Sequence, residues 1–336
     1  MITQKDIAQK LGLSQASVSK ALKNDPTIDK ATCERVRIAA HEMGYQPNAM
    51  ATGLAHFKQS SKIKPVDAAV AWIDAWPETK KRNRYRELDL CLQGARAGAE
   101  RFGYRLEEFS VSKEMPLSRI ENILRARNIR GILLLPHGGL KVEWHRFDWE
   151  HFSAVRLGRP FDEVALFHSV APDQSSNAAL AFSKMRERGY KRIGFLGVGT
   201  WHRAGFLERQ CEEPEALRVP PFTLPKQTPA TMIPELDKWL KCYKPDAILT
   251  EMREAVDIFT KAGYRIPEDI ALAGTTALDI PGVDAGIDQH PSETGRVASL
   301  LLISLLNEND RGTPAIQREI LIKGEWIDGK SLPKRS

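Results

Sequence analysis

Residues 2–55 read ITQKDIAQKLGLSQASVSKALKNDPTIDKATCERVRIAAHEMGYQPNAMATGLA, and this stretch decides how the chain begins to fold. Thr3 followed by Asp6 is typical of a helix start, because threonine caps the first amides and aspartate is favoured in the first turn. Apolar residues then recur at helical spacing as far as Gly12, which permits a turn that a residue with a Cβ resists. The apolar positions of this first expected helix are Ile7, Ala8 and Leu11.

Two more short helices are expected after the glycine turn. Ser14 can cap a second helix, QASVSKAL, which Asn24-Asp25-Pro26 ends. A third amphipathic helix covers about residues 30–43 and stops at Gly44. Three short helices, the first two joined by a glycine turn, predict a helix-turn-helix unit. The expected inward-facing residues of the second and third helices are Val18, Ala21, Leu22, Cys33, Val36, Ile38 or Ala39, Ala40 and Met43.

The outward positions of the second helix are small and polar. A helix that enters the major groove of DNA needs a front face without bulk, carrying amide, hydroxyl and cationic donors. An ordinary solvated face has the same composition, so this pattern alone leaves both interpretations open. Residues 1–64 contain ten Lys and Arg against five Asp and Glu, in a chain of net charge +6, which favours a polyanion partner. The outward residues are Gln15, Ala16, Ser17, Ser19 and Lys20.

Over its whole length, the stretch 2–55 resembles the DNA-binding headpiece of the LacI/GalR family of transcription regulators. The resemblance implies base readout by Gln15, Ala16 and Lys20, and phosphate contacts by two serines of the same helix. Lys20 stands where the family more often has arginine, so a point charge replaces a bidentate guanidinium and a softer preference for guanine is expected. The DNA-contacting residues that the resemblance implies are Thr3, Gln15, Ala16, Ser17, Ser19, Lys20, Asn24, Tyr45, Asn48, Ala51 and Leu54.

Residues 47–55, PNAMATGLA, resemble the hinge helix of the same family. By this resemblance Leu54 inserts between base steps in the minor groove, while Met50 and Ala51 pack between the two hinge helices of a homodimer. Gly53 departs from the family, which usually has a longer polar residue there, and glycine in a helix costs about 1 kcal/mol relative to alanine. We expect this helix to form only on DNA, so that Gly53→Ala tightens operator binding.

From Val66 onward, short apolar runs alternate with amphipathic helical stretches. Runs such as VDAAVAWI, GILLLP, RIGFLG, DAILT and IALAG predict parallel strands, and the stretches between them predict covering helices. The implied fold class is an all-α helix-turn-helix headpiece plus an α/β periplasmic-binding-protein-like (type I) effector domain of two parallel-sheet lobes. The motifs similar to the family's effector domain are ERGYKRIGFLG (187–197), KPDAI (244–248), AGYRIPEDIALAG (262–274) and IDQHPSETGRVASLLL (287–302).

The resemblance also implies how the chain divides. Residues 1–46 form the helix-turn-helix domain, 47–64 the hinge helix and a polar, basic linker, and 65–336 the effector domain. Three crossovers join two lobes within the effector domain. The expected lobes are an N-lobe of about 65–164 and 286–318 and a C-lobe of about 165–285 and 319–336.

Ligands of open α/β sheets gather at the carboxyl ends of the strands, and aromatic rings beside polar side chains suit a sugar. Three departures from the family change polar anchors: Thr275-Thr276-Ala277 replaces Phe-Asp-Asp, Glu251-Met252-Arg253 replaces an Asn-Asp pair, and His202 replaces an arginine. Such a cleft binds a different ligand or none, and we expect a different sugar or sugar derivative. The candidate effector-binding residues are Trp72, Asp74, Trp76, His137, Trp201, His202, Arg203, Glu251 and Thr275.

Other classes of protein fit the sequence less well. The polar N-terminus and the basic headpiece disfavour an exported sugar-binding protein, and no apolar run is long enough for a membrane span. An enzyme is disfavoured, because no nucleophile elbow, P-loop, carboxylate pair or metal-spaced His/Cys cluster is present, and Gly197-Val198-Gly199 lacks the rest of a dinucleotide motif. The four separated cysteines predict reduced thiols. We therefore expect no catalytic residues, no cofactor and no metal.

The sequence thus predicts a cytoplasmic regulator, by family default a repressor, that binds a palindromic operator as a dimer. A small molecule in the cleft between the lobes would change its affinity for DNA. The operator, the effector, the direction of its effect and any assembly beyond the dimer stay open at this stage.

Overall fold

The computed structural model describes residues 2–22, 25, 27–45, 68–75, 85–135, 142–159, 167–223 and 229–335. The chain divides into two compact units. The first unit comprises residues 1–80, 95–169 and 295–319, and the second comprises 81–94, 170–294 and 320–336. Each unit beyond the headpiece is built on one sheet. The hinge segment 47–55 and the linker lie outside the described residues.

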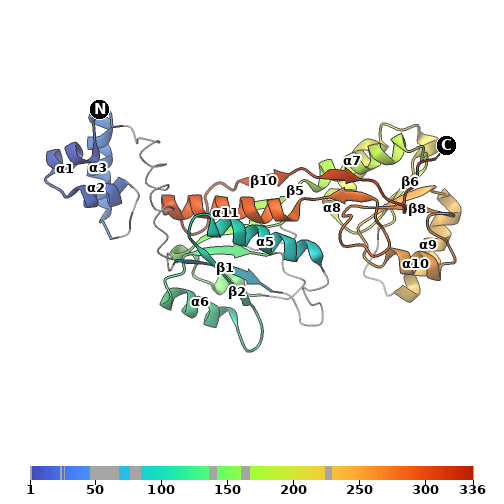
Figure 1. Cartoon of the computed structure of the whole chain (residues 1–336), viewed down its shortest axis with the longest axis horizontal. Helices are drawn as coiled ribbons and strands as arrows, with labels where there is room; N and C mark the ends of the chain where they lie inside the picture. The colour runs from blue at the N-terminus through green and yellow to red at the C-terminus, as the bar shows by residue number, and fades with distance from the viewer. Residues whose placement is uncertain are drawn as a thin grey trace. The chain divides into compact units, whose positions relative to one another are not determined.

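The headpiece is a bundle of three helices, as the sequence predicted (Figure 1). The Thr3 side chain accepts a hydrogen bond from the Asp6 amide, and the Asp6 carboxylate accepts one from the Thr3 amide at 2.7 Å, which completes a capping box. Gly12 ends the first helix with a φ of 67°, a conformation that favours glycine. The helices are α1 (Gln4–Leu11), α2 (Gln15–Leu22) and α3 (Lys30–Glu42).

The headpiece core contains the positions expected from helical spacing. Of the two alternatives on the third helix, Ala39 is buried, whereas Ile38 is 51% exposed. An ion pair of 3.0 Å between Lys10 and Glu42 joins α1 to α3 at the surface. The fully or nearly buried residues are Ile7, Ala8, Val18, Ala21, Cys33, Val36, Ala39 and Ala40.

The first unit contains a six-stranded sheet of order β10-β5-β4-β3-β1-β2, in which β1 pairs in parallel with β2 and β3, and β3 with β4. Ile120 and Leu124 of α6 pack on one face of this sheet. On the other face, a Cβ at Gly131 would lie 2.8 Å from the Leu306 side chain, so glycine lets α11 pack closely. The elements that form or cover this sheet are β1 (Ala69–Asp74), α5 (Arg86–Glu100), β2 (Arg105–Ser110), α6 (Leu117–Ala126), β3 (Gly131–Leu134), η3 (Trp144–Arg146), η4 (Trp149–His151), β4 (Ser153–Leu157), β5 (His168–Pro172), α11 (Pro291–Glu308) and β10 (Glu319–Ile322). Four of them cross the unit boundary: residues 86–94 of α5, 170–172 of β5, 291–294 of α11 and 320–322 of β10 belong to the second unit.

The second unit contains a five-stranded sheet of order β11-β9-β8-β7-β6, parallel except for the antiparallel pair of β11 and β9. Alternate strand residues face two separate cores: Phe195 packs with α7 and α8, and Leu196 with α9 and α10 (Figure 1). The elements are α7 (Gln174–Glu187), β6 (Ile193–Leu196), α8 (Thr200–Gln210), η5 (Glu215–Leu217), α9 (Pro229–Tyr243), β7 (Ala247–Thr250), α10 (Ala255–Lys261), β8 (Ala271–Gly274), β9 (Gly286–Asp288) and β11 (Glu325–Ile327).

These observations confirm the predicted helix-turn-helix headpiece and the two mostly parallel sheets. The exact lobe boundaries stay a prediction. All four cysteines, which the sequence predicted to be reduced, are free thiols: Cys33 and Cys91 are buried, and Cys211 and Cys242 are exposed.

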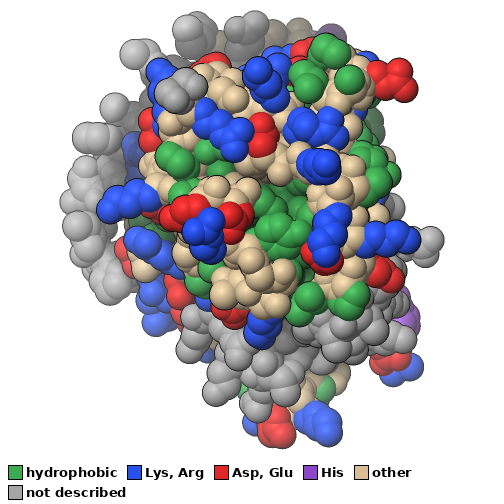
Figure 2. All heavy atoms as spheres, turned by 90° about the vertical axis from the view of Figure 1, so that its right-hand side faces the viewer, with side chains coloured by type: hydrophobic (Ala, Val, Ile, Leu, Met, Phe, Trp, Pro, Cys, Tyr) green, Lys and Arg blue, Asp and Glu red, His purple; other side chains and the backbone are tan. Residues whose placement is uncertain are grey.

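The surface is mixed in character, as are the helices. On the face shown in Figure 2, basic and acidic side chains are intermingled with apolar ones. Among the described residues, no helix combines the length and the apolar character that crossing a membrane requires.

Candidate functional site

The helix α2 presents one buried face and one exposed face. Val18 and Ala21 have no accessible surface, so they fix the helix on the headpiece core. The side chains on the opposite face are small or polar, which leaves room for base edges to approach. Gln15, Ala16 and Lys20 are exposed, and Ser17 and Ser19 are partly exposed.

Local hydrogen bonds hold both ends of this helix. Ser14 accepts a hydrogen bond from the Ser17 amide at 3.0 Å, and their hydroxyl groups lie 2.8 Å apart. Lys20 Nζ donates to Thr27 Oγ1 at 3.3 Å. Such contacts fix the position of α2 before any DNA is bound. Of the other predicted DNA-contacting residues, Thr3 is exposed, Tyr45 is partly buried against the headpiece core, and Asn24, Asn48, Ala51 and Leu54 lie outside the described residues.

Five predicted effector-binding residues meet at the carboxyl edge of the second unit's sheet. Trp201, His202 and Arg203 lie in the first turn of α8, directly after β6, while Glu251 follows β7 and Thr275 follows β8. Because the strands are parallel and adjacent, their carboxyl ends lie side by side. Trp201 is 38% exposed, whereas His202 and Thr275 are buried.

Close helix packing positions α8 at this edge. Gly205 faces α7, and a Cβ at this position would lie 1.9 Å from the backbone oxygen of Ser175. The glycine therefore brings the first turn of α8 down onto α7 and fixes where His202 stands. This helix was not among the elements expected from the sequence.

Glu251 contacts His202 and the start of α8. Its Oε1 accepts hydrogen bonds from the amides of Val198 and Gly199, and its Oε2 lies 2.9 Å from His202 Nδ1. Burial raises the pKa of Glu251, but the His202 hydrogen bond and charge, with the two amides, outweigh it and hold the pKa below its usual value. Glu251 is therefore ionised at neutral pH and keeps a proton on His202 Nδ1.

This arrangement leaves the other ring nitrogen of His202 available. His202 Nε2 is buried and has no hydrogen-bond partner among the described residues. Because Nδ1 is bonded to Glu251, Nε2 is the ring atom left for a ligand. A buried polar nitrogen without a partner is costly, so a polar group of a ligand would be stabilised there. Glu251 acts on such a ligand through His202 and is a positioning residue.

Residues that the sequence analysis missed complete the edge. Gln289, just after β9, is buried and donates from Nε2 to the Thr275 oxygen at 2.8 Å. The Asp279 carboxylate accepts from the amides of Arg86 at 2.7 Å and Glu87 at 3.2 Å, at the start of α5. The position of Gln289 directly after a strand could have identified it from the sequence. The Asp279 contact could not be identified in this way, because it joins segments almost two hundred residues apart.

Glu87 is the acid with the most perturbed environment at this edge. Burial raises its pKa to about 7; a hydrogen bond from Thr276 opposes this shift, and the charges of Asp279 and Asp288 add to it. A pocket of about 320 Å³ lies at the start of α5, on the chain neighbours of Glu87. Its lining residues are Arg86, Asp89, Arg253, Leu278, Asp279, Ile280 and Pro281.

Arg253 shapes this pocket through two contacts. Its guanidinium donates to the Asp279 backbone oxygen at 2.8 Å and lies 5.6 Å from the ring centre of Tyr85. The sequence analysis placed Arg253 among the departures from the family, but not among the candidate binding residues.

The remaining predicted effector residues lie elsewhere or are not described. Trp72 and Asp74 belong to β1 of the first unit. Trp72 has no accessible surface, and its Nε1 has no hydrogen-bond partner among the described residues. Asp74 is buried and accepts a hydrogen bond from Ser110 at 3.0 Å. Trp76 and His137 lie outside the described residues.

Comparison with known proteins agrees with this two-part organisation. Residues 3–48 match the model of bacterial regulatory proteins of the lacI family, and residues 182–332 match that of a periplasmic binding protein-like domain. The HTH-type transcriptional repressor CytR of Escherichia coli (strain K12) is 23% identical over 358 residues, covering 96% of this chain and 95% of that protein.

Solved structures share the fold over almost the whole chain. A complex of the transcriptional regulator CelR with cellobiose gives a TM-score of 0.59 at 18% identity, covering 98% of this chain and 100% of that one. The lac repressor dimer bound to operator and the anti-inducer ONPF gives 0.53 at 15% identity, covering 99% of each chain.

The headpiece and the two-sheet domain together define a DNA-binding transcription regulator with a periplasmic-binding-protein-like domain. The chain thus carries a DNA-binding domain that matches the lacI family over residues 3–48 and a periplasmic binding protein-like domain over residues 182–332. Its matched relatives are transcription regulators and not enzymes.

Proposed function

We propose that this regulator is a cytoplasmic repressor that binds a palindromic operator as a homodimer. The observation that carries the proposal is the exposed, small and polar face of α2, fixed on a rigid bundle whose sequence matches the lacI family. In a dimer, two such helices would enter successive major grooves, and the segment 47–55 would contact the minor groove between them. CytR is named a repressor, and the lac repressor structure is a dimer on its operator, which supports this proposal.

Within this function, Lys20 reads a guanine with less discrimination than arginine would. Lys20 is exposed at the end of α2 and presents a single charged nitrogen, whereas arginine offers two donors in a fixed fork. The Lys20→Arg variant should therefore sharpen the base preference at one position of each half-site.

Binding selection from a randomised duplex tests both statements. Wild type and Lys20→Arg are compared with Lys30→Arg, a matched control at the exposed start of α3. A palindromic site for all three proteins, with one position per half-site sharpened only in Lys20→Arg, supports the proposal. Identical base frequencies in the three selections would remove Lys20 from base readout, and no enriched sequence at physiological salt would refute specific binding altogether.

We further propose that the effector is a sugar or sugar derivative, held at the carboxyl edge of the second unit's sheet. Trp201 offers a ring face to a sugar, and the unpartnered His202 Nε2 offers a hydrogen-bonding position to a hydroxyl group. Trp72, Asp74, Trp76, His137, Arg203, Glu251 and Thr275 stay candidates in this proposal. The CelR structure contains cellobiose, which fits a carbohydrate effector for this fold.

A thermal-shift screen of sugars and sugar derivatives tests the effector. A ligand that raises the melting temperature of wild type, and does so less for His202→Ala, supports the proposed site, because ligand binding stabilises the folded state. A hit whose effect is unchanged in His202→Ala places the ligand elsewhere. Operator binding with and without a hit then gives the direction of regulation.

A further inference from the structure

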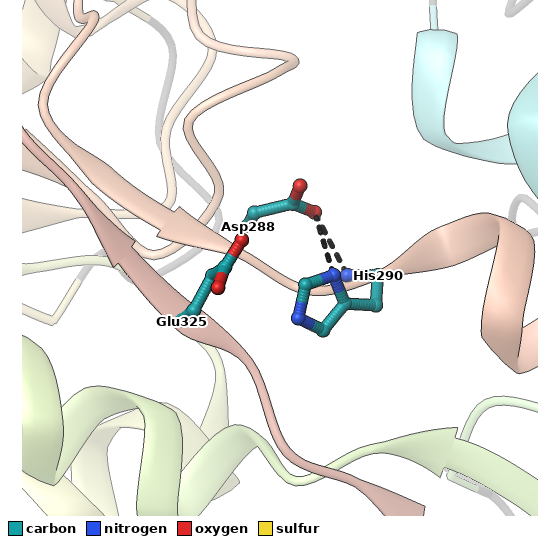
Figure 3. A group of neighbouring side chains, drawn as sticks. All are labelled: Asp288, His290 and Glu325. Atoms are coloured by element: carbon teal, nitrogen blue, oxygen red, sulfur yellow. Dashed lines mark hydrogen bonds and ion pairs between the residues drawn. The ribbon is translucent and has the colours of Figure 1, made fainter.

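Three side chains of the second unit with metal-binding atoms gather at the junction of β9, β11 and the start of α11. One ligand atom from each of Asp288, His290 and Glu325 lies within 4.8 Å of the other two (Figure 3). Asp288 ends β9, His290 stands just before α11, and Glu325 begins β11. The sequence did not indicate this group, because Glu325 is far along the chain and the spacing of histidines and cysteines showed no cluster.

Strand pairing places the two carboxylates together. In the antiparallel pair of β9 and β11, Asp288 and Glu325 are directly opposite each other. Like charges at directly opposed positions destabilise a sheet. Among the described residues, no lysine or arginine forms an ion pair with either carboxylate; the His290 ring lies 3.8 Å from Asp288. A bound cation would remove this repulsion.

The charge of Asp288 also acts on a nearby acid. The charge of Asp288 is one of the causes that raise the pKa of Glu87, so its field reaches a third acidic side chain of the same unit. Local hydrogen bonding orients the group as well. Asp288 accepts a hydrogen bond from the His290 amide at 2.8 Å, and His290 adopts a φ of 51°, a left-handed conformation that is uncommon outside glycine. This turn brings the imidazole back toward the Asp288 carboxylate (Figure 3).

The donor set selects the kind of cation. One imidazole nitrogen and two carboxylate oxygens suit zinc and similar transition ions, whereas magnesium and calcium prefer oxygen alone. Ligand atoms bound at about 2 Å from a shared zinc ion lie about 3 to 4 Å apart. Glu325 is exposed, so rotation of its side chain can close the remaining gap of about 1 Å.

We propose that Asp288, His290 and Glu325 bind one divalent transition-metal ion, for which zinc is the probe. Water completes the coordination, since three side chains leave positions open. The chain passes between the two units at residues 294/295 and 319/320, a few residues from these ligands. The ion therefore joins the segment by which the chain leaves the second unit to the segment by which it returns. The proposal departs from the expectation of no metal and does not depend on the identity of the operator or the effector.

Calorimetric titration of the full chain tests this site. Protein stripped with a chelator and dialysed is titrated with zinc chloride and, separately, with magnesium chloride. We expect one zinc ion per chain and no measurable magnesium binding. Glu325→Gln and His290→Gln should each weaken zinc binding at least tenfold, because each removes one ligand.

His151→Gln is the matched control, since His151 is exposed and lies 3.3 Å from a single carboxylate, that of Asp148. Circular dichroism of each variant checks that the fold is retained, and Glu325→Gln is an isosteric change on the surface. Cobalt gives a second readout, because its visible spectrum should change in both site variants and stay unchanged in the control. Absence of zinc binding, equal binding in all variants, or weakening in just one of the two site variants would overturn the three-ligand site.

Discussion

Replacing Glu87 by glutamine should make the effector domain more stable above neutral pH. Glu87 stands at the start of α5 and accepts a hydrogen bond from Thr276, while Asp279 and Asp288 contribute like charge. Burial with this charge raises its pKa from 4.5 to about 7. The folded protein therefore binds a proton that the unfolded chain has released between these two pH values, and it loses stability as the pH rises through this window.

The magnitude follows from the width of that window. At about 1.4 kcal/mol per pH unit, ionising Glu87 above pH 7 costs the folded state at most about 3.5 kcal/mol. The side chain keeps some contact with water, so we expect roughly 1 to 2 kcal/mol. Glutamine is neutral at every pH and can still accept the Thr276 hydrogen bond.

The assay is thermal unfolding of the full chain at pH 5 and pH 8. We expect Glu87→Gln to melt at a higher temperature than wild type at pH 8 and to approach it at pH 5. Glu100→Gln is the control, because Glu100 is exposed at the other end of the same helix. Equal differences between wild type and Glu87→Gln at both pH values would refute the electrostatic reasoning.

Three further predictions concern helix capping, helix packing and the Glu251 carboxylate at the sheet edge. Thr3→Ala should destabilise the headpiece by about 1 kcal/mol, with Thr3→Ser close to wild type, as followed by circular dichroism of the melting headpiece, because the capping box is lost. Gly205→Ala should reduce the free energy of unfolding by about 1 to 3 kcal/mol, because the added methyl group would collide with the Ser175 backbone. The melting temperature should fall accordingly, and an unchanged value would contradict this packing. Glu251→Gln should destabilise the protein by about 1 to 3 kcal/mol at pH 7, because the charged hydrogen bonds of Glu251 are weakened. The pKa of Glu251 is lowered in the folded protein, so this difference should shrink below pH 4.5 as the wild-type carboxylate is protonated. Denaturant titrations at pH 7 and pH 4 measure both values.

The headpiece could be predicted almost completely because its signals are local. The capping box, the glycine turn and the spacing of apolar residues each depend on neighbours within four positions. The choice between Ile38 and Ala39 could not be made from spacing, since either fits one helical face. The structure decides it by burying the smaller residue against α1 and α2.

In the effector domain, two strands were not predicted because they contain polar residues. Arg156 lies within β4 and His168 begins β5, and both are buried. His168 Nδ1 accepts a hydrogen bond from the Arg318 amide at 3.1 Å, a partner 150 residues away that apolar patterning cannot reveal. The strands with continuous apolar runs, such as β3, were predicted correctly.

The sequence predicted that several candidate residues lie at one sheet edge, but not the contacts that they make there. Placing His202, Glu251 and Thr275 after successive strands followed from strand order. That Glu251 contacts two backbone amides, and that Gln289 holds Thr275, depends on loops whose conformation the sequence does not specify.

The carboxylate of Glu251 at the start of α8 has a consequence for the chemistry of the effector. Exposed amides at the beginning of a helix are a common seat for phosphate and for other anions. Here the Glu251 carboxylate already accepts hydrogen bonds from these amides. A phosphorylated or acidic sugar would be repelled by this carboxylate and would have to compete with it for the amides. The regulator should for this reason respond to uncharged carbohydrates in preference to their phosphate esters.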